Sequence, residues 1–114
     1  MSRENARYRV LIVDDDESVL LSLEWLLETE GHETTLAWSG ADAQVLLASR
    51  SFDLVLLDAN LRDVSAAEVV SWARSIGHTS RCILLEPSTR LQQIDSVCKL
   101  GNMAMACGTQ LAAN

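Results

Sequence analysis

Short apolar runs alternate along the chain with longer segments in which apolar and polar residues are mixed. Three of the runs are continuous and rich in Val, Ile and Leu, which is typical of strands that are buried on both faces. A short β-branched run and a weaker apolar run near the C-terminus predict two more strands. The five expected strands span residues 10–13, 32–37, 53–58, 81–85 and 103–107.

The segments between the expected strands carry apolar residues at helical spacing. Asp16 is placed to cap the first helix, and Gly31 is placed to end it in the left-handed conformation. Ser39 is the expected N-cap of the second helix. The four expected helices span residues 17–30, 41–48, 66–75 and 88–100.

Strict alternation of strands and helices predicts an α/β fold, in which helices cover both faces of a parallel sheet. Right-handed crossovers and five strands favour the flavodoxin-like strand order 2-1-3-4-5. Binding sites in such sheets form at the carboxyl ends of the strands, beside the point where the order reverses. That point lies here between the first and third strands.

A fifth helix beside the first one is expected to be missing, because only seven residues follow the last expected strand. One sheet face would then be partly open beside Val13 and the third to fifth strands. An open apolar patch of this kind marks an interaction surface. We therefore expect the chain either to self-associate, for example as a homodimer, or to be a fragment whose continuation supplies the helix. A downstream effector is the other partner that such a surface would suit.

A chain of 114 residues with 48% apolar and 22% charged residues has the size and composition of one globular domain. Its net charge of −7 would repel phosphate backbones, which argues against direct binding of nucleic acid. The three cysteines lack metal-ligand spacing and are expected to be reduced thiols. Because the sequence shows no signal segment and no membrane-spanning run, we expect a cytoplasmic protein without membrane contact.

Acidic residues follow two of the continuous strands. Asp14, Asp15 and Asp16 come directly after the first strand, and Asp58 ends the third. The expected strand order brings Asp14, Asp15 and Asp58 to one corner, where like charges are costly unless a cation binds. A donor set of oxygens alone suits Mg²⁺ better than Zn²⁺. Helix capping explains Asp16, but it does not explain acids at the ends of two neighbouring strands.

The two acidic motifs together resemble the receiver domain of response regulators in two-component signalling. They are VLIVDDD at residues 10–16 and DLVLLD at residues 53–58. The helix end at Glu30-Gly31 and the segment LAWSG at residues 36–40 match the same family. The resemblance covers residues 9–108 as one receiver domain of atypical sequence, with short tails at residues 1–8 and 109–114.

The resemblance implies that Asp58 is the phosphoacceptor of a Mg²⁺-dependent phosphorelay. The phosphoryl donor would be a histidine kinase or a phosphotransfer protein. By the same resemblance, Asp15 is the direct metal ligand, Asp14 acts on the metal through water, and Asn60 offers its backbone carbonyl. The chain would then be a signalling domain rather than an enzyme. An aspartate-nucleophile phosphatase would need a second acid two residues after Asp58, where this chain has Asn60.

The sequence departs from the family pattern at the positions that contact the phosphoryl group. Glu86 stands where the fourth strand usually carries Thr or Ser, whose hydroxyl binds the phosphoryl group. Gly108 stands where the fifth strand usually carries Lys, and Met105 replaces an aromatic residue. Because an ionised Glu cannot donate a hydrogen bond, we expect a weakened response to phosphorylation.

Four residues are candidates to replace these lost contacts. Arg62 and Arg90 could supply the positive charge of the missing lysine, although both also suit a solvated surface. Ser88 and Thr89 could supply a hydroxyl, although one of them also suits the N-cap of the fourth helix.

Two functions are therefore left open. The first is a receiver that accepts phosphoryl on Asp58, which the acid trio favours. The alternative is a degenerate receiver, a protein-interaction module that acts without phosphorylation, which Glu86 and Gly108 favour.

Overall fold

The computed structural model describes residues 7–86 and 109–110. Every boundary from β1 to β4 lies within one residue of the boundary that the sequence predicts. The elements are β1 (Arg9–Val13), α1 (Glu17–Thr29), β2 (Glu33–Ala37), α2 (Gly40–Ser49), β3 (Leu54–Asp58), α3 (Ala66–Ser75), β4 (Arg81–Leu85) and β5 (Thr109–Gln110).

The strands form one sheet in the order β2-β1-β3-β4-β5. Neighbouring strands from β2 to β4 are parallel, which confirms the flavodoxin-like order 2-1-3-4 and the α/β class. The two-residue strand β5 pairs with β4 in the antiparallel direction. The strand expected at residues 103–107, the helix expected at 88–100 and the expected absence of a fifth helix all concern residues outside the described ones.

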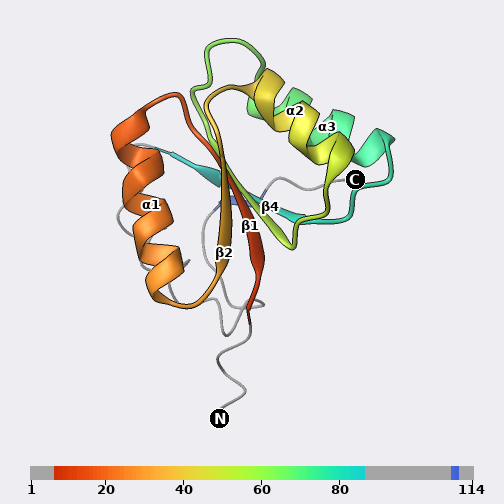
Figure 1. The fold of residues 1–114 in the computed structure, drawn as a ribbon. Coiled ribbons are helices and arrows are strands. Elements are labelled where there is room, and N and C mark those ends of the chain that lie inside the picture. The colour runs from red at the N-terminus through yellow and green to blue at the C-terminus, as the bar shows by residue number, and fades with distance from the viewer. Residues whose placement is uncertain (1–6, 87–108, 111–114) are drawn as a thin grey trace.

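Helices cover the two faces of the sheet as separate layers, with α1 on one side and α2 and α3 on the other (Figure 1). Alternate residues of each strand point to opposite faces, because the side-chain period of a strand is two. The α1 face buries Leu20, Leu23 and Leu27 of the helix against apolar residues of the strands. These strand residues are Val10, Ile12, Leu54, Leu56, Ile83 and Leu85.

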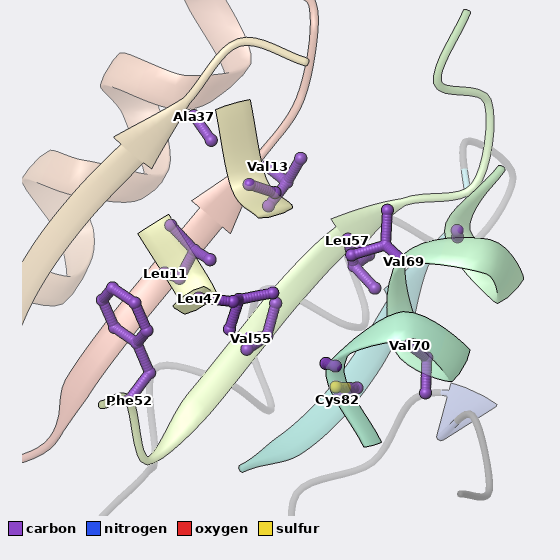
Figure 2. Packing of buried hydrophobic residues seen from close by; sticks show 13 residues of the cluster. Leu11, Val13, Ala37, Leu47, Phe52, Val55, Leu57, Val69, Val70 and Cys82 are labelled. Carbon is purple, nitrogen blue, oxygen red and sulfur yellow. The ribbon is translucent and has the colours of Figure 1, made fainter. Parts of the chain in front are cut away.

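The opposite face is a second buried cluster beneath α2 and α3 (Figure 2). Leu11, Val55 and Leu57 pack there with Val69 and Val70 of α3. Cys82 of β4 is part of this cluster and is a buried free thiol, as expected. Burial raises the pKa of the Cys82 thiol, so the thiol stays protonated and inert at neutral pH.

The open apolar patch expected beside the third strand and Val13 is not found among the described residues. Val13 belongs to the α2–α3 cluster, because Val10 and Ile12 occupy the α1 face and the strand alternates. On the α1 face, Leu54 and Leu56 are 0% exposed and share one cluster with the α1 leucines. This part of the prediction is wrong, and self-association stays a prediction without support from such a patch.

The capping residues of α1 and α2 are the ones that the sequence predicts. Asp16 caps α1 by accepting a hydrogen bond from the backbone N–H of Ser18, and Ser39 caps α2 through the N–H of Asp42. Gly31 follows α1 with φ of +94°, a left-handed conformation that favours glycine. Of the helices in the described residues, none is long and apolar enough to cross a membrane.

Candidate functional site

The sheet register brings the two acidic strand ends together. Val13 of β1 pairs with Leu57 of β3, and an aspartate follows each of these two residues directly. Asp14 and Asp58 therefore stand side by side at the carboxyl edge, where the strand order reverses between β1 and β3. The sequence-based prediction of an acidic corner at this point is confirmed.

The corner holds three carboxylates in close proximity. One oxygen each from Asp14, Asp15 and Asp58 lies within 4.8 Å of the others. Asp14 is 1% exposed and Asp58 is 4% exposed, whereas Asp15 is at the surface. We call these three residues the acidic cluster.

Backbone N–H groups orient the two buried carboxylates. The N–H of Asp16 donates to Oδ1 of Asp14 over 2.9 Å. The N–H of Asn60 donates to Oδ1 of Asp58 over 3.2 Å. Each donor lies two residues after its acceptor, a local turn that fixes the side chain in place.

The acidic cluster fits a divalent cation of the hard, oxygen-binding kind. Three carboxylates at this spacing repel one another in the absence of a counter-charge. Their donor atoms are all oxygens, which suit Mg²⁺. Zn²⁺ prefers nitrogen and sulfur ligands, which the cluster does not contain. The surface position of Asp15 gives the cluster an open side toward solvent.

The segment of residues 59–65 connects β3 to α3 and borders the acidic cluster; we call it the site loop. It contains Asn60, which sequence reasoning assigns to the metal, and Arg62. The Nε atom of Arg62 lies 3.4 Å from Oδ2 of Asp15, so the candidate counter-charge does reach the cluster. The Arg62 side chain is 90% exposed.

Asp63 is a site-loop residue that the sequence analysis missed. Its two carboxylate oxygens accept hydrogen bonds from the backbone N–H groups of Gly40 and Ala41, each over 3.0 Å. These donors belong to the first turn of α2, more than 20 residues away in sequence. An acidic residue in a turn-forming segment was the only sequence signal, and it does not identify the partner helix.

The remaining expected site residues lie at the end of β4 or outside the described residues. Glu86 directly follows Leu85, the residue that pairs with Asp58, so Glu86 is at the same edge of the sheet. It is half-buried there. The structure does not describe Ser88, Thr89, Arg90, Met105 or Gly108.

The sequence matches one family of known domains over most of its length. Residues 10–105 match the family described as the response regulator receiver domain. The polar-differentiation response regulator DivK of Brucella ovis is 37% identical over 65 residues, which are 57% of this chain and 53% of that protein. The alginate biosynthesis transcriptional regulatory protein AlgB of Pseudomonas putida is 34% identical over 73 residues.

These matches cover only part of the curated relatives. The matched region is 64% of this chain but 16% of AlgB, and 53% of DivK. The chain therefore spans well under two thirds of the length of these relatives.

Solved structures show the same likeness. The response regulator TrrA from Thermotoga maritima, in complex with Mg²⁺ and beryllium fluoride, is 30% identical with a TM-score of 0.65. That match covers 76% of this chain and 77% of TrrA. A CheY-like receiver domain from Methylobacillus flagellatus is 29% identical with a TM-score of 0.67, covering 71% and 70% of the two chains.

Proposed function

This chain belongs to the response regulator receiver domain family, and we propose that its Asp58 accepts a phosphoryl group from a histidine kinase or a phosphotransfer protein. One observation carries the proposal: Asp14, Asp15 and Asp58 meet at the carboxyl ends of β1 and β3. A capping role accounts for Asp16, but it gives no reason for two buried acids beside each other.

Asp58 has the surroundings of an oriented nucleophile. It ends a strand whose five residues are all buried, so its Cα is fixed by the sheet. The N–H of Asn60 holds one carboxylate oxygen at 3.2 Å. In the proposed step, a carboxylate oxygen of Asp58 forms a bond to phosphorus while the bond from phosphorus to the donor's histidine nitrogen breaks.

Asp14 and Asp15 are the proposed metal residues, together with Asp58 and the backbone carbonyl of Asn60. Bound Mg²⁺ would offset most of the negative charge of the cluster and reduce the repulsion between Asp58 and an anionic phosphoryl group. The complex of TrrA with Mg²⁺ and beryllium fluoride supports this assignment by similarity. Localisation in the cytoplasm, where such donors operate, is part of the same proposal.

Arg62 is the proposed contact of the phosphoryl group on the protein side. Its guanidinium already pairs with Asp15, so a short movement of an exposed side chain would bring its charge to Asp58. An arginine offers planar, paired donors to phosphate oxygens. Arg62 could therefore replace the positive charge of the lysine that the family usually carries. Arg90, Ser88 and Thr89 are further proposed contacts on sequence grounds alone.

The second candidate function is a receiver that binds its partners without phosphorylation. Glu86 favours it, because this acid lies at the edge of the sheet that also carries Asp58. An anion at that position opposes a second anion on Asp58 and cannot donate to it when ionised.

Intact-protein mass spectrometry with a small phosphodonor such as acetyl phosphate separates the two functions. We expect a mass increase of one phosphoryl group that requires Mg²⁺ and is lost in Asp58→Asn. The matched control is Asp42→Asn, which removes an exposed acid from the first turn of α2 and should retain the increase. A folded wild-type protein that gains no mass in Mg²⁺ would favour the interaction module.

A further inference from the structure

Three hydrogen-bonded attachments hold the site loop, in addition to the packing of Leu61 and Val64 against the buried cluster and the pair of Arg62 with Asp15. At its start, the N–H of Ala59 donates to the carbonyl of Leu85 over 2.9 Å. At its end, Ser65 and Glu68 form a capping box that begins α3. Between these ends, the side chain of Asp63 reaches across to α2. Asn60 and Arg62 lie between the attachments at Ala59 and Asp63.

The contact of Asp63 with α2 is specific for a carboxylate. The first N–H groups of a helix lack partners within the helix and carry a partial positive charge. Asp63 supplies one oxygen to Gly40 and the other to Ala41. These backbone hydrogen bonds lower the pKa of Asp63, although its side chain is exposed. The carboxylate is therefore ionised and paired at neutral pH.

Gly40 allows the loop and the helix to approach closely. A Cβ atom built on Gly40 would lie 2.8 Å from the Cβ of Val64, a separation that real Cβ contacts essentially never show. Val64 in turn packs against the buried cluster beneath α2 and α3. The backbone of the site loop thus rests directly on the start of α2, and Asp63 provides the polar part of that contact.

We propose that Asp63 is a positioning residue, whose carboxylate fastens the site loop to α2 and so holds Asn60 and Arg62 over the acidic cluster. In so far as Asn60 acts on Mg²⁺, this inference rests on the proposed function. Arg62 immediately precedes Asp63 in the chain. The contact of Asp63 with α2, which we call the clamp, therefore also restrains the backbone of Arg62. Asn60 lies three residues before Asp63, between the attachments at Ala59 and Asp63.

Ser39 offers a matched control for a purely structural effect. Its hydroxyl caps the same helix, α2, by accepting from the N–H of Asp42 over 3.0 Å. Loss of either contact should destabilise the start of α2. Only the loss of the Asp63 contact should release the site loop.

Backbone ¹⁵N relaxation in the absence of metal tests the clamp directly. In Asp63→Ala, we expect the amide order parameters of Asn60, Leu61 and Arg62 to fall from about 0.85 toward 0.6. Asp63→Asn, which retains one acceptor oxygen, should give an intermediate fall. Ser39→Ala should leave these three amides unchanged. Unchanged order in Asp63→Ala, or an equal fall in Ser39→Ala, would overturn the inference.

A Mg²⁺ titration measures the consequence for the site. It is best done in an Arg62→Ala background. In the presence of Arg62, loosening of the site loop would also free Asp15 from its ion pair, and this gain in Mg²⁺ affinity would offset the loss caused by removing Asp63. There, Asp63→Ala should weaken Mg²⁺ binding by about tenfold, the lower end for residues that orient metal ligands. Equal affinity with and without Asp63 would contradict its positioning role. If the parent protein bound no Mg²⁺, the proposed metal site would fail, and the relaxation result would decide the role of Asp63.

Discussion

The Nε atom of Arg62 lies 3.4 Å from Oδ2 of Asp15, so a cation of the protein occupies one side of the acidic cluster. This pair has two consequences. It relieves part of the repulsion among the three carboxylates, and it competes with any metal that needs Asp15. Because Arg62 is exposed, the pair is weak and can exchange readily.

Arg62→Ala should tighten Mg²⁺ binding. An exposed ion pair contributes roughly 0.2–1 kcal/mol, which corresponds to a gain of up to about fivefold in affinity. Arg62→Lys keeps the charge and should change the affinity less. Arg50→Ala is the control for loss of an exposed arginine, since Arg50 hydrogen-bonds to Thr35 on another part of the molecule. Weaker Mg²⁺ binding in Arg62→Ala would show that Arg62 supports the metal rather than competing with it.

The response to a phosphoryl mimic should be small in the wild-type protein. A ligand shifts a conformational equilibrium only by its difference in interaction energy between the two states. With Glu86 and Gly108 at the usual hydroxyl and lysine positions, few such contacts are expected. Beryllium fluoride with Mg²⁺ should therefore shift amide signals near Asp58 but few beyond it.

The double variant Glu86→Thr and Gly108→Lys should enlarge that response. It restores the residue types that the family uses to contact the phosphoryl group. Amide signals distant from Asp58 should then shift on addition of the mimic. Wide shifts already present in the wild-type protein would contradict the account of a weakened switch.

Gly40→Ala should destabilise the fold, although alanine is normally the better helix former. The added Cβ would meet the Cβ of Val64 at 2.8 Å, and the cost of such overpacking is about 1–3 kcal/mol. Denaturant unfolding should show this loss. Alanine at position 64 still has a Cβ, so the double variant Gly40→Ala/Val64→Ala should recover little of the lost stability. Val64→Gly in the Gly40→Ala background removes that Cβ and should relieve the contact. A neutral Gly40→Ala would show that the loop moves away without cost.

His32 should make stability depend on pH in a defined window. Burial lowers the pKa of His32 below 6.5, against an opposing effect of Glu30, and its Nδ1 accepts from the N–H of Tyr8. Below pH 6.5 the unfolded chain binds a proton that the folded protein resists, so the free energy of unfolding falls as pH decreases. The fall ends where His32 protonates in the folded state.

Thermal unfolding across this range measures the effect of His32. The difference between wild type and His32→Asn should change with pH below about 6.5 and stay constant above it. A difference that is independent of pH throughout would contradict the assignment.

Local patterns were sufficient to predict most of the framework. The continuous run Leu54–Asp58 predicted a buried strand, and Gly31 marked the end of α1 through its conformational freedom. The acidic cluster followed because parallel strands share one carboxyl edge, so acids at two strand ends must meet there.

Contacts between distant segments were not accessible in the same way. The clamp from Asp63 to Gly40 depends on how closely the loop approaches α2, which no local pattern encodes. The pair of Arg62 with Asp15 likewise depends on the path of the site loop. The error over Val13 was of another kind, because strand alternation from Val10 and Ile12 already assigns it to the α2–α3 face.

The most direct test of the account is to locate the phosphoryl group itself. Borohydride reduces an aspartyl phosphate to homoserine, which peptide mass spectrometry identifies at a single residue. After treatment with acetyl phosphate and Mg²⁺, we predict homoserine at position 58 and none at positions 14 or 15. Homoserine at Asp14 or Asp15, or its absence from a folded and Mg²⁺-loaded protein, would contradict the claim that Asp58 is the phosphoacceptor.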